Sequence, residues 1–343
     1  MKVILDYSIF FHQKYGGISR YFLNLHNQYL KKDIDAKIIA PIHSNIFLKN
    51  SKYNNFNGYY IKNYPKYTRK IFKTYNHFFS KFFSKLFKPN IIHKTFYYKN
   101  FDNNHKIKKI LTVYDLAHEI YYKEYNNSEL NKPKKNALKN VDYIICPSNK
   151  TKSDLINYYQ IPEDKIKVIY MGIHEFEDIK NKNLSIKGDP FILYVGDRKR
   201  YKNFHTLLKA FSISSKVQKD FKLICFGGGK FTNDEKLFHL YKNAKVFIFP
   251  SKYEGLGLPQ LEAMSLGCPV ISSNHEAILE AVGNAAELFN PNSAEELCFK
   301  MEETLYSSEK IKNLINKGFD RSKEFSWKKC SNETLEVYKK ITN

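Results

Sequence analysis

The chain has few cysteines, and no two of them stand close together. Five occur in 343 residues, and Cys146, Cys225 and Cys268 stand in apolar runs, where cysteine behaves as a small hydrophobic residue. This spacing suggests neither a disulfide framework nor a cysteine-rich metal cluster. We therefore expect a protein of a reducing compartment, the cytoplasm.

Long hydrophobic runs are also missing. No stretch approaches the roughly 20 apolar residues that cross a bilayer. The first residues, Met1 to Tyr7, contain Asp6 and are too short for the core of a signal peptide. The sequence thus predicts a cytoplasmic protein and leaves open a peripheral attachment to the inner face of the cytoplasmic membrane.

Acidic residues are scarce in the first third of the chain. Residues 1–105 hold 18 Lys and Arg against four Asp, a balance of +14 out of +22 for the whole chain, and the first glutamate is Glu119. Such an excess indicates an anionic partner: nucleic acid, an acidic membrane surface or a phosphorylated substrate. No recognised nucleic-acid-binding module accompanies the charge, so nucleic acid is not the expected partner. A coding bias toward Lys and Asn is the other explanation.

The segment 66–88 has no acidic residue at all. Its basic residues are Lys66, Arg69, Lys70, Lys73, Lys81, Lys85 and Lys88, and its main apolar residues are Ile71, Tyr75, Phe78, Phe79, Phe82, Phe83, Leu86 and Phe87. On a helix, this spacing gives a cationic face and an aromatic face, which is typical of a helix lying in a membrane interface. A helix that packs within its domain and leaves its basic side in solvent is the alternative.

Apolar runs alternate with segments of helical spacing along the rest of the chain, which favours parallel sheets with helices on both faces. The expected strands are Val3–Leu5, Ala36–Ile42, Lys109–Val113, Val141–Cys146, Lys165–Tyr170, Phe191–Val195, Phe221–Phe226, Ala244–Phe249 and Cys268–Ser272. Residues 43–64 have the composition of an irregular loop, and 173–189 that of a linker. We expect an α/β protein of two doubly wound domains, with a cleft where the carboxyl ends of their strands meet.

The segment Phe249–Met264 combines the end of a strand, a glycine loop and the start of a helix. Gly255 and Gly257 permit a tight loop, and the N–H groups of a helix start attract anionic or hydroxyl-rich ligands. Glu254 in the loop and Glu262 in the helix can face the same crevice. This stretch predicts a site for a ligand that carries hydroxyl groups and negative charge.

Four cations, Arg198, Lys199, Arg200 and Lys202, follow the strand Phe191–Val195. Cations at the carboxyl end of a strand can offset the charge that builds on a leaving diphosphate. Such a loop alone is more often solvated surface. Beside the two glutamates it predicts a sugar-diphosphate pocket.

Two further features belong to the first half. Gly16 and Gly17 lie between a strand and a helix, where glycine lets the backbone approach a ligand, although many such turns are only turns. His118 follows the strand Lys109–Val113, close to Asp115. The histidine is either an active-site group or a capping residue of its loop.

Together these motifs resemble the retaining glycosyltransferases of family 4, whose GT-B architecture has two Rossmann-like domains. The matching segments are Gly16–Tyr21, Val113–Glu119, Pro147-Ser148, Val168–Ile173, Tyr194–Phe204, Tyr253–Met264 and Phe325–Lys329. The resemblance covers nearly the whole chain. It implies an N-terminal acceptor-side domain (1–173), a C-terminal donor domain (174–325) and a terminal helix (326–343) that packs back on the first domain.

The resemblance also implies roles for single residues, all numbered as in this chain. Arg198 and Lys202 would hold the donor's diphosphate, Glu254 the sugar hydroxyls and Glu262 the nucleotide ribose. Backbone N–H groups for the sugar would come from Gly255, Leu256, Gly257 and Leu258. Gly16 and Gly17 would lie under the donor phosphate or the acceptor, and His118 near the reacting sugar. No cofactor and no metal are expected, because protein cations replace the metal; Asp33-Ile-Asp35 is read as the start of a strand.

The implied activity is transfer of a hexose, with mannose as the first choice, from a nucleotide diphosphate sugar to a glycan or polyprenyl-linked glycan in surface-polysaccharide (O-antigen) synthesis. Front-face attack is the implied mechanism. One departure concerns residues 230–243, which leave room for one helix where the family has more structure near the nucleotide base. The alternative is therefore a catalytically impaired GT-B protein that binds a nucleotide sugar or a membrane surface.

Overall fold

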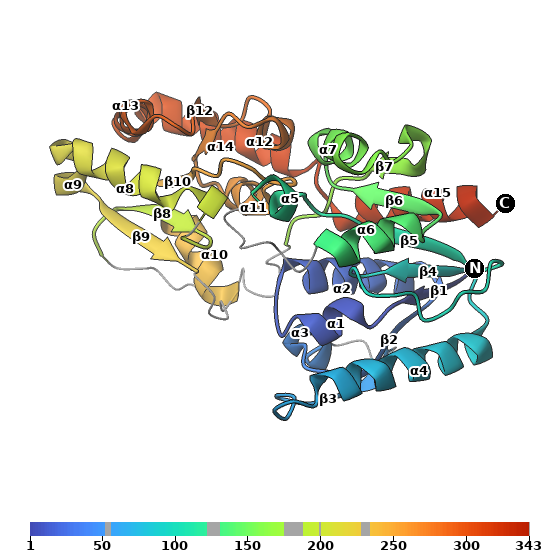
Figure 1. The fold of residues 1–343 in the computed structure, drawn as a ribbon. Helices are drawn as coiled ribbons and strands as arrows, with labels where there is room; N and C mark the ends of the chain where they lie inside the picture. Colours follow the sequence, from blue (N-terminus) through green and yellow to red (C-terminus); the bar gives the residue numbers. More distant parts are fainter. Residues whose placement is uncertain (52–55, 122–130, 175–187, 199, 228–233, 343) are drawn as a thin grey trace. The chain divides into compact units, whose positions relative to one another are not determined.

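The computed structural model describes residues 1–51, 56–121, 131–174, 188–198, 200–227 and 234–342. They form two compact units, one of residues 1–147, 151–172 and 327–343, the other of 148–150 and 173–326 (Figure 1). Each unit is built on one parallel sheet, as the alternating runs predict. The assignment of an acceptor side and a donor side stays a prediction.

The first unit contains a seven-stranded sheet in the order β3-β2-β1-β4-β5-β6-β7, and all neighbouring strands are parallel. The strands are β1 (Lys2–Leu5), β2 (Asp35–His43), β3 (Phe56–Tyr60), β4 (Ile91–Lys94), β5 (Lys108–Thr112), β6 (Tyr143–Cys146) and β7 (Ile166–Val168). The central strands are buried along nearly their whole length, because helices cover a parallel sheet. Parallel order places all carboxyl ends at one edge.

The helices of this unit are α1 (Ser8–His12), α2 (Gly17–Leu30), α3 (Ile46–Lys49), α4 (Arg69–Phe87), α5 (Ala117–Ile120), α6 (Asn131–Lys139), α7 (Asn149–Tyr159) and α15 (Trp327–Thr342). The C-terminal helix α15 packs on α2. The buried Tyr338 hydroxyl accepts a hydrogen bond from Tyr29 at 3.0 Å and lies 2.6 Å from Nδ1 of His93 in β4. These contacts fix the end of the chain to the first sheet.

The second unit has a five-stranded parallel sheet in the order β12-β11-β10-β8-β9. Its strands are β8 (Phe191–Val195), β9 (Lys222–Phe226), β10 (Val246–Phe249), β11 (Val270–Ser273) and β12 (Glu287–Phe289). Its helices are α8 (Phe204–Ile213), α9 (Ser215–Asp220), α10 (Asp234–Asn243), α11 (Leu258–Ser265), α12 (Glu276–Val282), α13 (Ala294–Leu305) and α14 (Ser308–Ser322). A core cluster joins residues of β8, β10 and β11 to residues of α8 and α13.

Helix α4 places three small polar side chains and Phe87 toward its domain. Asn76, Ser80 and Ser84 are buried. The Asn76 side chain accepts from the backbone N–H of Ile42 at 2.7 Å and donates to its carbonyl at 2.9 Å. The outward residues are large and apolar: Ile71, Phe78, Phe82 and Leu86 are 67%, 65%, 59% and 65% exposed. The helix thus packs within its domain and leaves its basic side in solvent, as the alternative predicts, and part of its aromatic face is in solvent as well. Its position on a membrane stays a prediction.

The expected irregular loop 43–64 is wrong in part, because it contains α3 and β3. Strand β3 has the sequence FNGYY and forms the edge of the sheet. Its pattern is weak because Asn57 and Gly58 replace apolar residues. A Cβ on Gly58 would come within 1.9 Å of the Ala40 carbonyl oxygen, so glycine is needed where β3 approaches β2.

Other elements carry too little pattern to be predicted. Strand β4 has two isoleucines followed by His93 and Lys94, and β12 has three residues. Helix α14 also went unpredicted. Helix α10 lies within the shortened segment 230–243, as expected, and residues 230–233 are outside the described residues. Most of the predicted linker 173–189 lies outside the described residues.

Candidate functional site

The strand β10, the loop 250–257 and the helix α11 form a strand–loop–helix unit, as the sequence predicts. The loop ends at Gly257, whose φ of 87° lies in the left-handed region. A Cβ there would lie 2.6 Å from Nε2 of Gln260 and 3.0 Å from a ring carbon of Phe249. Glycine is therefore required on both counts, and it sets the direction in which α11 begins.

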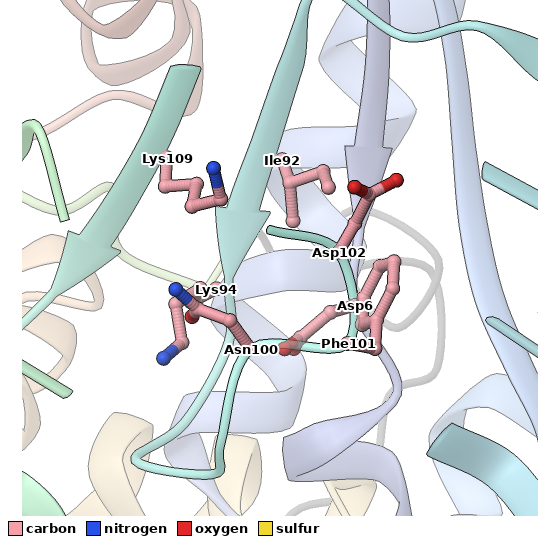
Figure 2. A pocket seen from close by; sticks show the side chains of 7 residues that line it. All are labelled: Asp6, Ile92, Lys94, Asn100, Phe101, Asp102 and Lys109. Atoms are coloured by element: carbon pink, nitrogen blue, oxygen red, sulfur yellow. The ribbon is translucent and has the colours of Figure 1, made fainter. Parts of the chain in front are cut away.

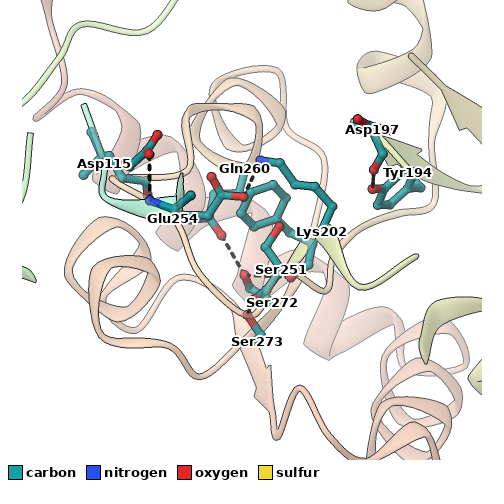
Figure 3. A network of polar contacts seen from close by, with 12 residues as sticks. Asp115, Tyr194, Asp197, Lys202, Ser251, Glu254, Gln260, Ser272 and Ser273 are labelled. Atoms are coloured by element: carbon teal, nitrogen blue, oxygen red, sulfur yellow. Dashed lines mark hydrogen bonds and ion pairs between the residues drawn. The ribbon is translucent and has the colours of Figure 1, made fainter. Parts of the chain in front are cut away.

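Gln260 and two serines hold this helix start against the sheet. The buried Gln260 side chain accepts a hydrogen bond from Oγ of Ser272 in β11 at 2.7 Å and donates to the carbonyl of Leu256 (Figure 3). Ser273 Oγ donates to the carbonyl of Ser251. Because these partners are buried, the loop is fixed by bonds that water does not replace.

Four consecutive backbone N–H groups lie at the start of α11. Within the described part of the chain, the amides of Gly255, Leu256, Gly257 and Leu258 donate to no acceptor. Gly255, Leu256 and Gly257 are buried residues. Unpaired buried N–H groups are costly unless a ligand or water accepts from them, and the helix dipole favours a partially negative ligand.

Lys202 and Glu254 form an ion pair beside these amides, with 2.6 Å between Nζ and Oε1 (Figure 3). The lysine side chain is 24% exposed and the glutamate 11%. The ammonium group compensates for the desolvation of the carboxylate. An ammonium group has three donors, so Lys202 can bind Glu254 and a further oxygen at once.

The backbone around Lys202 is fixed by its neighbours. The backbone N–H of Lys252 donates to the carbonyl of Tyr201 at 2.7 Å. Asn203 has φ of 56° and donates its side-chain amide to the carbonyls of Pro250 and Pro291, at 3.0 and 2.7 Å. The cationic segment is thereby tied to the loop that carries Glu254.

Arg198 precedes this segment and is exposed. Its Nη2 donates to the carbonyl of Cys225 in β9 at 3.1 Å, and its guanidinium lies 5.8 Å from the ring centre of Phe204. The remaining donors of the guanidinium can accommodate the oxygens of a phosphate. The side chain of Arg200 and all of Lys199 lie outside the described residues.

Glu262, on α11, lies against α10. The hydroxyl of Tyr241 in α10 donates to Glu262 Oε2 at 3.4 Å. Burial, together with the charge of Glu262, raises the pKa of Tyr241 well above its usual value. The carboxylate is thus oriented by a neutral phenol.

Gly16 and Gly17 lie at the start of α2 in the first unit. Gly16 has an extended backbone, and no atom would come within 4 Å of a Cβ on Gly17. The Ser19 hydroxyl donates to the Gly16 carbonyl at 3.0 Å. The space beside Gly17 is open to a ligand.

His118 lies in α5, directly after β5. Asp115 Oδ1 accepts from the backbone N–H of Ala117 at 3.0 Å and so helps to fix the helix start. The next residue, Glu119, forms a buried ion pair of 2.8 Å with Lys134, their side chains being 4% and 2% exposed. The short helix that carries His118 is therefore anchored by a buried charge pair.

A small cavity in the first unit is lined by Asp6, Ile92, Lys94, Asn100, Phe101, Asp102 and Lys109 (Figure 2). Its volume is about 10 Å³, room for about one water molecule. Asp6 accepts hydrogen bonds from the backbone and the hydroxyl of Thr95 at 2.8 and 2.6 Å. Burial lowers the pKa of Lys94 to about 8, although Asp6 acts in the opposite direction. This cavity is an internal polar junction, too small for a sugar.

Family models cover both halves of the chain. The description Glycosyltransferase Family 4 matches residues 15–175, and Glycosyl transferases group 1 matches 175–236 and 229–321. Sucrose-phosphate synthase from Thermosynechococcus elongatus has the same fold, with a TM-score of 0.75 over 99% of both chains at 17% identity. The chain is a GT-B glycosyltransferase.

Two relatives of this glycosyltransferase come from Escherichia coli. O-antigen chain mannosyltransferase B is 25% identical over an alignment of 278 residues, which covers 70% of this chain and 72% of that protein. Serotype-specific mannosyltransferase WbdA is 25% identical over an alignment of 263 residues, which covers 66% of this chain and 32% of that protein. The match thus spans about a third of the length of WbdA.

Within the glycosyltransferase, the structure brings several predicted residues together in the second unit. Lys202 contacts Glu254, which directly precedes the unpaired amides. Glu262 lies in α11, which begins at these amides, and contacts Tyr241 of α10. Gly16, Gly17 and His118 belong to the first unit. Their roles stay predictions.

Among the described residues, no three His, Cys, Asp or Glu side chains are grouped so that they could hold a metal ion. The expectation of a metal-independent enzyme stays a prediction.

Sequence reasoning missed the residues that hold the site in place. Asn203 ends the cationic segment in a left-handed conformation, which asparagine adopts more readily than most residues. Gln260 is the third residue of its helix, a position where glutamine often satisfies a helix start. Both signals were present in the sequence, but they are weak without their partners, Pro250, Pro291 and Ser272.

Proposed function

We propose that this glycosyltransferase moves a hexose, with mannose as the first candidate, from a nucleotide diphosphate sugar to a glycan or polyprenyl-linked glycan, with retention at the anomeric carbon. The observation that carries the proposal is the Lys202–Glu254 pair beside four unpaired amides. It offers a cation for a phosphate and a carboxylate for sugar hydroxyls within one small site. Mannose and the O-antigen context are supported by the names of the two relatives.

The donor residues have separate tasks in this proposal. Arg198 and Lys202 hold the two phosphates, Glu254 accepts hydrogen bonds from the sugar hydroxyls, and Glu262 accepts from the ribose. The four amides from Gly255 to Leu258 also donate to the donor. Fixed cations take the place of a divalent metal at the leaving diphosphate.

Transfer breaks the bond between the anomeric carbon and the diphosphate oxygen and forms one between that carbon and an acceptor hydroxyl on the same face. The hydroxyl proton passes to the departing diphosphate, so charge and atoms balance without a cofactor. Lys202 stabilises the negative charge that grows on the leaving group, because a preorganised cation in a partly buried site needs little rearrangement. His118, Gly16 and Gly17 are proposed to serve the sugar and the acceptor.

We also propose that α4 lies on an anionic membrane surface, where a lipid-linked acceptor is found. Four aromatic side chains of α4 are exposed: Tyr75, Phe78, Phe79 and Phe82. The helix also carries Arg69, Lys70, Lys73, Lys81 and Lys85, and it contains no acid. Apolar area and attraction to anionic lipid add together in such helices. No helix within the described ranges has the length and apolar character that crossing a bilayer requires.

The membrane in question is proposed to be the cytoplasmic membrane, approached from its inner side. Cys146, Cys225, Cys268, Cys298 and Cys330 are all free thiols. Free thiols suit a reducing compartment, and net positive charge suits the anionic inner leaflet.

The test of the proposed function is a panel of UDP-, GDP- and ADP-hexoses incubated with a polyprenyl diphosphate glycan. Mass spectrometry follows sugar transfer, and NMR of the product reads the anomeric configuration. We expect transfer from one donor, with retention. Binding of a donor without release of nucleoside diphosphate would support the alternative of a catalytically impaired GT-B protein. A product with inverted anomeric configuration would exclude front-face attack.

A further inference from the structure

A cationic pocket of about 400 Å³ lies in the first unit. Its lining includes His12, Lys14, Lys62, Tyr64 and Arg69. These residues follow the strands β1 and β3, which flank β2 in the sheet, so the pocket lies beyond the carboxyl ends of these strands. Ligands of open parallel sheets bind at this edge, and the volume is in the range of small-molecule sites.

The charges of this pocket have no carboxylate partner. Of the described residues that line it none is acidic, and in the described part of the chain Lys14 and Lys62 form no ion pair. The Arg69 guanidinium lies 5.5 Å from the ring centre of Phe11 and 5.8 Å from that of Tyr64. Aromatic rings therefore hold the arginine in place and leave its charge available. Uncompensated cations in a concave site concentrate a positive potential and attract anions.

His12 is affected by the same positive charge. Partial burial, followed by the charges of Arg69 and Lys73, lowers the pKa of His12 to about 4. Its ring stacks on Phe96 with 4.4 Å between centres, and Nδ1 is 3.3 Å from the hydroxyl of Tyr98. At neutral pH the imidazole is uncharged, so it can form a hydrogen bond to an anion without adding to the repulsion among the cations.

The pocket borders the first turn of α4, since Arg69 both lines it and begins the helix. The exposed apolar residues of α4 begin next to Arg69: the side chain of Ile71 is 67% exposed and that of Tyr75 48%. A molecule with a charged group in the pocket and a hydrocarbon chain attached to it would find apolar surface next to its charge. The two features together fit an amphiphile with an anionic head.

We propose that this pocket binds the phosphates that join the acceptor glycan to its lipid, while the lipid lies along the outer face of α4. The proposal rests on the proposed function and narrows its acceptor to a lipid-linked diphosphate. Two flexible ammonium groups and one planar guanidinium can reach oxygens of a diphosphate from several directions.

The experiment measures binding of geranyl diphosphate by isothermal titration calorimetry, without any donor. The double variant Lys14→Gln/Lys62→Gln removes two exposed charges and leaves Arg69 and its ring contacts in place. The matched control is Lys219→Gln/Lys312→Gln, which removes two exposed lysines of α9 and α14 in the second unit. We expect the first variant to bind about 10-fold or more weakly, because it loses two charge-assisted contacts, and the control to stay within about twofold.

Equal affinity in the pocket variant and the wild type, or an equal loss in the control, would overturn the proposal. Inorganic pyrophosphate and geraniol separate the parts of the ligand. If pyrophosphate binds as tightly as geranyl diphosphate, the site takes a free diphosphate and the lipid contact is wrong. The titration needs no turnover, so a failure of the donor panel leaves its result intact, and a failure here leaves the donor panel intact.

Discussion

The two cationic regions of this glycosyltransferase differ in how their charge is compensated. In the second unit, Lys202 is paired with Glu254 at 2.6 Å. In the first unit, Lys14 and Lys62 have no acidic partner in the described part of the chain. One site therefore offers a cation and an acceptor group together, and the other offers only positive charge.

This difference suggests different ligands. A sugar diphosphate carries hydroxyl groups and charge, so a mixed pair can bind both parts. A lipid-linked diphosphate has charge at one end and hydrocarbon at the other, which matches a cationic pocket beside the exposed face of α4. Paired charges are also held more rigidly than unpaired ones, and rigid groups are better suited to stabilising a transition state.

The largest effect is expected where a paired cation is fully buried. Lys134→Met leaves the Glu119 carboxylate without its cationic partner, and an uncompensated buried charge costs about 3–5 kcal/mol. Thermal unfolding of the variant should show that loss. The matched control is Lys152→Met, which breaks the exposed pair with Glu163. It should leave the midpoint temperature of thermal unfolding unchanged. Similar midpoints for both variants would show that burial does not determine the strength of these pairs.

The next effect concerns the paired cation of the donor site. Glu254→Gln keeps a polar group but removes the charge that orients Lys202 and accepts from sugar hydroxyls. We expect kcat/KM for the donor to fall about 100- to 1000-fold, the range for a lost electrostatic contact in an active site. Glu295→Gln, whose glutamate pairs with Lys209 on the surface, is the control. If kcat/KM of Glu254→Gln stays close to that of the wild type, Glu254 does not belong to the donor site.

The smallest effects on stability are expected in α4, whose buried and exposed faces can be compared. Asn76→Ala, on the buried face, should cost about 1–3 kcal/mol, because it removes the two hydrogen bonds that Asn76 makes to the backbone of Ile42. Phe78→Ser/Phe82→Ser should change the unfolding free energy by about 0.5 kcal/mol or less per site, since both rings are exposed. The wild type should sediment with anionic vesicles in preference to neutral ones, and the same double variant should no longer sediment with them. A stable protein that still sediments would contradict a role for the aromatic face.

The sequence predicted the donor loop well because its signals are local. Gly257, Glu254 and the helix start stand within a few residues of one another. The pairing of Glu254 with Lys202 joins residues 52 apart in sequence, so it depends on the order of β8 and β10 in the sheet. No local pattern contains that order.

The orientation of α4 was not predictable for a related reason. Three- and four-residue spacing defines two faces but does not say which one meets the sheet. Asn76 decides it, because its side chain bonds to Ile42, where the register between β2 and β3 shifts. A polar residue at that position indicates packing only once its backbone partner is known.

The most direct test of the central claim is release of nucleoside diphosphate from the donor that the panel identifies, measured for wild type and Lys202→Met. If Lys202 stabilises the leaving diphosphate, wild type releases the nucleotide and the variant does so about 100- to 1000-fold more slowly. Equal rates for the two proteins would contradict this account of the donor site.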